Sequence, residues 1–186
     1  MVVWLSGPTG AGKTSIARLL DAAGHSIVRE YAPENLFQAF ACDPVDGCEP
    51  LQRYLMQARA EGWRDVQDTP YVVFDRSIDE DINVFCKMHK GNGLLTERQF
   101  DSLKQLGDTL QNRIPAPDLI VFVSADYDVL SRRIQSARVP SVIAQTLQMQ
   151  IFLYAEWLRT RTEELLRIDT TYLTNRTLGK LISGIV

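Results

Sequence analysis

A chain of 186 residues with 45% hydrophobic and 23% charged residues has the length and composition of one soluble globular domain with a substantial core. Its net charge of −3 argues against a surface built for nucleic acid, and no apolar run is long enough to cross a membrane. The three cysteines follow no zinc or disulfide spacing, and the two histidines, His25 and His89, stand alone and are assigned no role. We therefore expect a single cytoplasmic domain spanning residues 1–186, with reduced thiols and no membrane partner.

The beginning of the chain carries the most specific motif. An apolar strand at 2–5 leads into Gly-Pro-Thr-Gly-Ala-Gly-Lys-Thr at 7–14, which matches the pattern G-x-x-x-x-G-K-T. This pattern predicts a phosphate-binding loop, because its glycines let successive backbone N–H groups face an anion. Apolar residues at helical spacing then continue to Gly24, so the loop lies at the N-terminus of a helix, where the helix dipole favours phosphate.

A nucleotide that donates phosphate, ATP or another NTP, is expected at this loop. Lys13 would reach its β- and γ-phosphates, and the Thr14 hydroxyl would ligate Mg²⁺. The complete set of loop residues expected to contact the nucleotide is Gly7, Thr9, Gly10, Ala11, Gly12, Lys13, Thr14 and Ser15.

The middle of the chain is predicted to alternate strands and helices. A short strand at 26–29 ends at Glu30, and an apolar strand at 71–74 ends at Asp75-Arg76-Ser77. Between them, residues 31–50 are expected to be irregular apart from a short helix at 35–41. The longer helices of this part are expected at 51–64, 78–88 and 96–113, the last opened by a capping box of Thr96 and Gln99.

The last third continues the alternation. The elements expected here are a strand at 118–123, a helix at 126–137, a long helix from Pro140 to 167, a strand at 168–173 and a terminal helix capped by Asn175. Continuous apolar strands separated by helices predict an α/β fold: a parallel sheet of about five strands with helices on both faces. The strand order 2-3-1-4-5 is expected because the sequence, with its phosphate loop, resembles the P-loop kinases. The site should lie at the carboxyl ends of the strands, beneath a short lid at about 132–141.

With the loop, Glu30 and Asp75-Arg76-Ser77 placed at three strand ends, the sequence resembles the deoxyribonucleoside kinases, P-loop enzymes that phosphorylate the 5′-hydroxyl of deoxynucleosides. The similarity extends over most of the chain. It includes a glutamine and an arginine seven residues apart at Gln52 and Arg59, Pro-Asp-Leu-Ile at 117–120, and Tyr154 with Trp157. The resemblance implies a kinase dependent on ATP and Mg²⁺ that acts on a small nucleoside or nucleotide.

The resemblance also assigns catalytic roles. Glu30 matches the general base for the attacking hydroxyl, Arg76 the arginine that orients both groups, and Asp75 the acid that helps Thr14 to hold Mg²⁺. A neighbouring arginine favours the ionised form of a carboxylate, as a general base requires. Positioning and charge neutralisation by Lys13, Arg76 and Arg133 would supply most of the catalysis, because phosphoryl transfer needs little covalent help.

Four residues match the part of the family that binds the nucleobase. Gln52 matches the amide that binds the base edge, and Arg59 lies two helical turns along the same face. Asp81 is expected to pair with Arg59, and Phe85, four residues later, matches the aromatic residue that stacks on the base.

Two departures from the family affect the acceptor. The family usually has proline directly after its catalytic glutamate, whereas here the proline is delayed to Pro33. In the lid, Arg133 occupies the first arginine position, but Ala137 and Val139 occupy the next two, and residues 136–140 contain no acid to bind the sugar 3′-hydroxyl. Arg138 is the candidate for a second phosphate contact in the lid.

These departures leave other functions open. A phage-type kinase that phosphorylates 5-hydroxymethyldeoxyuridine already in DNA would need no contact to a free 3′-hydroxyl, and would extrude the base into the site. The acidic net charge opposes that interpretation. A third alternative is an NTPase that transfers phosphate only to water. The acceptor base, the choice of ATP or GTP as donor, and assembly into a homodimer also stay open.

Overall fold

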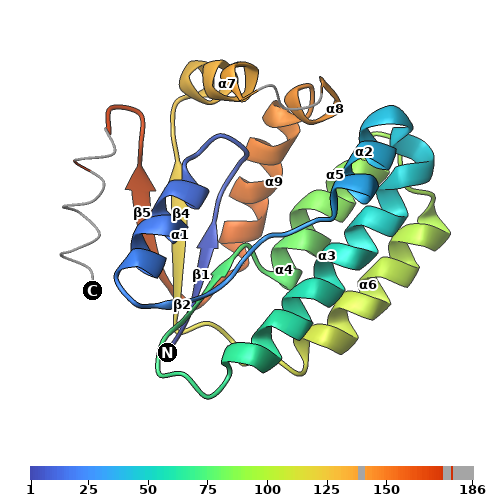
Figure 1. The fold of residues 1–186 in the computed structure, drawn as a ribbon. Coiled ribbons are helices and arrows are strands. Elements are labelled where there is room, and N and C mark those ends of the chain that lie inside the picture. Colours follow the sequence, from blue (N-terminus) through green and yellow to red (C-terminus); the bar gives the residue numbers. More distant parts are fainter. Residues whose placement is uncertain (138–140, 174–176, 178–186) are drawn as a thin grey trace.

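A parallel β-sheet forms the centre of the computed structural model, which describes residues 1–137, 141–173 and 177 (Figure 1). Its strands are β1 (Val2–Ser6), β2 (Ser26–Val28), β3 (Val72–Asp75), β4 (Leu119–Ser124) and β5 (Glu164–Asp169). Their order is β2-β3-β1-β4-β5, and all neighbouring pairs are parallel. This confirms the predicted sheet and its strand order.

Helices connect the strands. They are α1 (Lys13–Ala22), α2 (Glu34–Cys42), α3 (Pro44–Val66), α4 (Ile78–Glu80), α5 (Lys87–Gly91), α6 (Glu97–Gln111), α7 (Tyr127–Ser136), α8 (Ser141–Ala144) and α9 (Leu147–Arg159), with a π-helical segment η1 (Asp81–Cys86) between α4 and α5. The predicted capping box is present at the start of α6, where the Thr96 hydroxyl accepts from the Gln99 N–H and Thr96 N–H donates to the Gln99 side chain. In the described part of the chain, no helix is both long and apolar enough to span a membrane.

The two faces of the sheet bury different side chains, because successive residues of a strand point to opposite sides. The side chains packed against α3, η1, α6 and α9 include Val2, Trp4, Val72, Phe74, Ile120 and Phe122. Those packed against α1 and α7 include Leu5, Val73, Val121 and Val123. Figure 1 shows α3 and α6 on one side of the sheet and α1 on the other, so helices cover both faces as expected.

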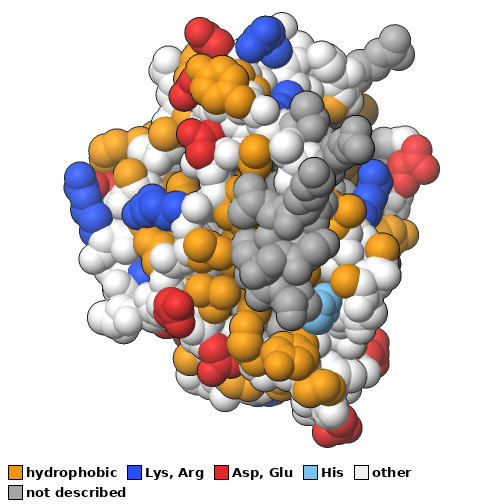
Figure 2. All heavy atoms as spheres, turned by 90° about the vertical axis from the view of Figure 1, so that its left-hand side faces the viewer, with side chains coloured by type: hydrophobic (Ala, Val, Ile, Leu, Met, Phe, Trp, Pro, Cys, Tyr) orange, Lys and Arg blue, Asp and Glu red, His pale blue; other side chains and the backbone are white. Residues whose placement is uncertain are grey.

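The surface on the β5 side of the molecule is of mixed charge. Figure 2 shows this face, and in its described part Lys and Arg side chains lie scattered among Asp and Glu rather than gathered into one basic area. This distribution agrees with the acidic net charge of −3.

The structure corrects the prediction for residues 44–50, which form the first turns of α3 instead of an irregular segment. The Asp43 side chain caps this helix by accepting hydrogen bonds from the N–H groups of Val45 and Asp46, both at 3.1 Å. Pro44 occupies the first helical position, where proline is well tolerated. Pro50 lies inside the helix, where proline is normally unfavourable because it lacks a backbone N–H. The burial of its neighbours Cys48 and Leu51 in the core favours the helix nevertheless.

The structure also corrects the prediction for residues 140–173. The long helix is divided into α8 and α9 and ends at Arg159 rather than 167, and β5 begins at Glu164 rather than 168. Glu, Leu and Arg are good helix formers, so local propensity favours a helix over 164–167. Backbone pairing with β4, from Leu119 opposite Glu164 to Ser124 opposite Asp169, decides otherwise. The expected cap at Asn175 lies outside the described residues.

Candidate active site

The loop between β1 and α1 has the conformation that its glycines predict. Gly7, Gly10 and Gly12 have positive φ values of 141°, 81° and 101°. A Cβ atom at Gly7 would lie 2.1 Å from the Val123 carbonyl oxygen, so no other residue fits there. Among the described residues, the backbone N–H groups of this loop that have no acceptor include those of Gly10, Gly12, Lys13 and Thr14. Unpaired donors at a helix N-terminus fit an anionic phosphate.

Lys13 lies folded onto this loop. Its ammonium group donates to the carbonyl oxygens of Gly7 at 2.7 Å and Pro8 at 3.0 Å. Burial, together with the nearby Arg76 charge, lowers the pKa of Lys13 to about 8. The group therefore remains mostly protonated at neutral pH and provides a positive charge beside the loop.

Arg76 connects the loop to three other side chains. Its guanidinium group donates to Glu30 at 2.8 Å, to Glu80 at 2.8 Å, to the Gly7 carbonyl at 3.1 Å and to the Tyr154 hydroxyl at 2.6 Å. It is almost completely buried, with 5% of its surface exposed. The side chain therefore holds Glu30 in a defined position relative to the phosphate loop.

The backbone of Arg76 is strained. Its φ of 71° lies in the left-handed region, which costs a residue other than glycine about 1 to 2 kcal/mol. A hydrogen bond from Arg76 N–H to the Leu5 carbonyl at 3.1 Å holds this conformation at the end of β3. Such strain is characteristic of functional sites, where the surrounding structure compensates for it.

Glu30 is ionised by its neighbours. Burial alone would raise the pKa of Glu30, but Arg76, Arg59 and Lys13 together outweigh it and hold this pKa below its usual value. The carboxylate is 3.8 Å from Arg59 in addition to its 2.8 Å contact with Arg76. Glu30 therefore has the charge that a proton acceptor needs at neutral pH.

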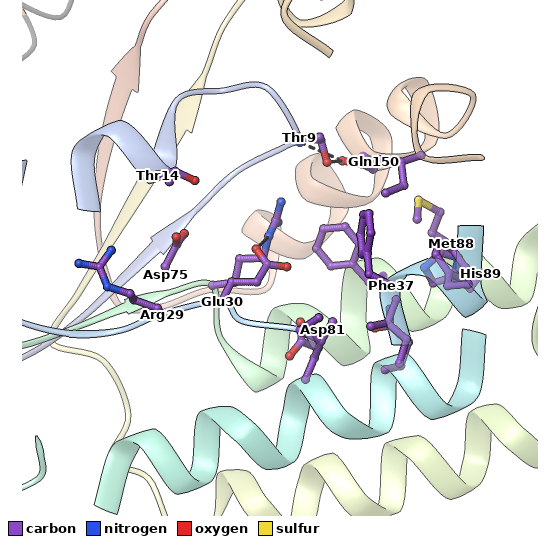
Figure 3. Close-up of a pocket in the computed structure, with 18 residues that line it drawn as sticks. Thr9, Thr14, Arg29, Glu30, Phe37, Asp75, Asp81, Met88, His89 and Gln150 are labelled. Atoms are coloured by element: carbon purple, nitrogen blue, oxygen red, sulfur yellow. Dashed lines mark hydrogen bonds and ion pairs between the residues drawn. The ribbon is translucent and has the colours of Figure 1, made fainter. Parts of the chain in front are cut away.

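Asp75 and Thr14 lie at the same end of the cavity drawn in Figure 3. The Oδ1 atom of Asp75 is buried and has no hydrogen-bond partner among the described residues. Burial raises the pKa of Asp75, and Lys13 partly opposes this effect. An unpartnered buried carboxylate oxygen fits a cation, and Mg²⁺ is usually bound by one or two carboxylates together with phosphates and water. The two residues therefore fit the predicted metal site.

A cavity of about 350 Å³ extends from this end towards α3 and α5. Gln52, Asp81 and Phe85 line it, while Arg59 and Asp81 form a buried pair with contacts of 2.9 Å and 3.1 Å. The expected contact between these two residues is thus present. The Phe85 ring centroid lies 4.4 Å from the Arg76 guanidinium carbon. Three of the four residues predicted to bind the base, Gln52, Asp81 and Phe85, therefore line one cavity that is large enough for a small ligand, and Arg59 is connected to it through Asp81.

A second cavity, of about 510 Å³, lies over the phosphate loop. Arg133 lines it and donates to the carbonyl oxygens of Gly10 at 3.2 Å and Thr170 at 2.8 Å. Arg138, the other arginine expected here, lies outside the described residues. The residues that line both cavities are Thr9, Thr14, Glu30 and Arg76. The two spaces therefore meet at the carboxylate–arginine pair.

Two residues of this site, Glu80 and Gln150, have little or no signal in the sequence. Glu80 is fully buried and accepts from the Ser6 hydroxyl at 2.8 Å as well as from Arg76 and Tyr154. In the sequence Glu80 is only an acid near a helix start, and its spacing of four from Arg76 is the one available hint. Gln150 of α9 accepts from the N–H and hydroxyl of Thr9 at 3.0 Å and 3.1 Å.

A parallel sheet in this strand order, with a Gly-rich loop between β1 and α1 and a carboxylate–arginine pair facing it, defines a nucleotide-binding protein of the P-loop kinase class. The family model of deoxynucleoside kinases matches residues 3–160, and the chain belongs to this family.

Relatives and solved structures agree with this assignment. The deoxyguanosine kinase of Lactobacillus acidophilus is 31% identical over 146 residues, which are 75% of this chain and 64% of the relative. The deoxyadenosine kinase of Dictyostelium discoideum is 33% identical over 134 residues, which are 70% of this chain and 54% of the relative. The chain thus spans less than two thirds of the length of these relatives.

The fold has a clear structural counterpart. The deoxyadenosine kinase from M. mycoides, solved with dCMP and dCDP bound, has a TM-score of 0.84 at 19% identity, covering 100% of this chain and 98% of that chain. This similarity supports the fold. None of these relatives is described as acting on DNA, so the alternative of a DNA-modifying kinase gains no support from them.

Proposed function

We propose that this protein transfers the γ-phosphoryl group of ATP to the 5′-hydroxyl of a purine deoxynucleoside. The observation that carries the proposal is the place where the two cavities meet: Glu30 and Arg76 line both of them, between the phosphate loop and the base-binding residues. The relatives, which are a deoxyguanosine kinase and a deoxyadenosine kinase, support a purine acceptor.

The acceptor reacts at the junction of the cavities. Its 5′-oxygen attacks the γ-phosphorus in line, its proton passes to the Glu30 carboxylate, and the bond to the leaving ADP oxygen breaks. Arg76 holds Glu30 in place through its 2.8 Å contact. Lys13 and Arg133 stabilise the negative charge of the transferred group. Thr14 and Asp75 would hold Mg²⁺, which would supply positive charge to the phosphate oxygens.

The remaining cavity wall would hold the acceptor base. Phe85 offers a ring face for stacking, and Gln52 offers an amide whose Nε2 has no hydrogen-bond acceptor among the described residues. The buried Arg59–Asp81 pair keeps these elements in place and contributes charge beside Glu30.

The proposal is tested with γ-labelled ATP, Mg²⁺ and a panel of acceptors: the four deoxynucleosides, their monophosphates, and DNA that contains 5-hydroxymethyldeoxyuridine. We expect label on the 5′-oxygen of deoxyguanosine or deoxyadenosine and none on DNA. Label on DNA alone, or phosphate release at a rate that no acceptor changes, would overturn the proposal.

A further inference from the structure

His89 of α5 is a buried polar residue that has no role in the proposed reaction. Only 4% of its surface is exposed, and its Nδ1 atom is buried without a hydrogen-bond partner among the described residues. Its ring packs edge-on against Phe40, with 5.5 Å between the ring centroids. Native proteins rarely leave a buried polar atom unpaired. His25 also has an unpaired buried nitrogen, Nε2, but only His89 of the two lines the acceptor cavity, where a ligand could supply a partner.

The position of His89 relates it to the base-binding residues. Asp81, Phe85 and His89 follow one another at intervals of four along η1 and α5, and all three line the acceptor cavity. Because all three line the same cavity, η1 and α5 present them to one space although η1 is π-helical. Figure 3 shows His89, Met88 and Phe37 at the end of the cavity away from Thr14 and Asp75. An acceptor with its 5′-hydroxyl at Glu30 and its base at Phe85 therefore directs the far edge of that base towards His89.

The chemistry of this end suits a base edge. Burial lowers the pKa of His89 to about 4, so the imidazole is neutral at physiological pH and offers one donor and one acceptor. The surroundings are mostly apolar, with Phe37, Phe40, Met88 and Ile143 lining the same cavity. A purine edge carries ring-nitrogen acceptors and an exocyclic oxygen or amine, which can bind a neutral imidazole.

We infer that His89 hydrogen-bonds the base of the acceptor and makes the enzyme prefer purine over pyrimidine deoxynucleosides. This inference rests on the proposed function and names one determinant of its specificity. A pyrimidine is one ring shorter and would leave the buried imidazole of His89 unpaired. Sites that leave a buried hydrogen-bonding group unpaired discriminate strongly against the shorter substrate.

The test compares kcat/KM for deoxyguanosine, deoxyadenosine, deoxycytidine and thymidine in the wild type and three variants. His89→Phe keeps an aromatic ring but removes both nitrogens, and His89→Gln keeps a donor and an acceptor. His25→Phe is the matched control, because His25 packs against Tyr71 and lines neither of the two cavities. A cooperative thermal unfolding transition is used to verify that each variant is folded.

We expect His89→Phe to lower kcat/KM for purines by about 10- to 100-fold, with little change for pyrimidines and for the KM of ATP. His89→Gln should restore part of the purine preference, and His25→Phe should keep all of it. If folded His89→Phe lowers purine and pyrimidine turnover equally, or lowers neither, the inference is wrong while the proposed function stands. If the wild type phosphorylates no free deoxynucleoside, the proposed function fails and the inference fails with it.

Discussion

Arg76 shows how one residue can determine the geometry of this site. Its guanidinium group is shared among Glu30, Glu80, Tyr154 and the Gly7 carbonyl, so the proton acceptor and the phosphate loop have one common support. The strained φ of 71° is the local consequence of placing this side chain at the end of β3.

Glu30→Gln tests the proposed proton acceptor at the residue scale. The amide keeps the shape of the side chain but cannot take the hydroxyl proton, so we expect kcat to fall by about 10²- to 10⁴-fold. Binding of ATP, measured by calorimetry, should be nearly unchanged. Glu34→Gln on α2 is a suitable control, since Glu34 is exposed and lines neither of the two cavities. A near-normal kcat would make Glu30 an ordinary loop residue.

The lowered pKa of His89 also predicts how the stability of the fold depends on pH. Its pKa is about 4 in the folded protein and about 6.5 in the unfolded chain, so the unfolded state binds more protons between these values. Stability therefore falls as pH falls from about 6.5 towards 4. Between pH 7 and pH 5 we expect the wild type to lose about 2 kcal/mol more of its unfolding free energy than His89→Phe. Urea titrations at both pH values measure this difference, and equal losses in the two proteins would refute it.

At the scale of elements, the phosphate loop depends on α9 as well as on its own glycines. Gln150 is fully buried and accepts two hydrogen bonds from Thr9, and its amide nitrogen donates to Thr146 at the start of α9. The helix that follows the predicted lid is thus bonded to the loop that would hold the nucleotide. The π-helical turn η1 has a similar role on the other side, because it carries both Asp81 and Phe85 into the acceptor cavity.

Gln150→Leu should disturb the loop without removing any group that would touch phosphate. The substitution leaves the Thr9 N–H and hydroxyl without their acceptor, which costs about 1 to 3 kcal/mol for buried groups. We expect a rise in the KM for ATP and a lower melting temperature. Gln148→Leu on the same helix is the control, since Gln148 is exposed. Equal effects of the two substitutions would show that the Thr9 contact is unimportant.

At the scale of the whole molecule, the sheet brings four segments to one edge. The phosphate loop, Glu30, Asp75-Arg76 and Thr170 follow the carboxyl ends of β1, β2, β3 and β5. Two cavities open there and share their central residues, so the donor and the acceptor would bind side by side. The single domain and the lid remain predictions, and assembly into a homodimer stays open.

Ligand binding should stabilise the entire fold, because it involves the ends of several strands. ATP with Mg²⁺ at about 100 times its dissociation constant contributes about 2.7 kcal/mol, which corresponds to a rise of about 5 to 11 °C in melting temperature. Lys13→Ala should abolish most of this rise while the protein without ligand stays folded, since in the described part of the chain the Lys13 ammonium group donates to the loop carbonyls of Gly7 and Pro8 and not to groups of the core. Differential scanning fluorimetry measures both values. An unchanged rise in the variant would contradict the assigned role of Lys13.

The sequence by itself determined the phosphate loop and the parallel sheet, because these depend on local patterns, and the strand order followed from the family resemblance. Gly7 needs a backbone conformation and a clearance that only glycine has, and the apolar strands specify their own burial. The contact between Arg59 and Asp81 also followed from spacing and family resemblance, and the structure contains it.

Only the tertiary structure decided the features that depend on partners far away in the chain. Residues 164–167 favour a helix locally, yet they form a strand because β4 offers unpaired backbone groups beside them. Glu80, Gln150 and His89 look like ordinary helix residues in the sequence. Glu80 contacts Tyr154, which is 74 residues away in the chain, and Gln150 contacts Thr9, which is 141 residues away. His89 lines a cavity that is formed by several different elements. Contacts of such long range leave no local pattern, so the packed fold is needed to reveal them.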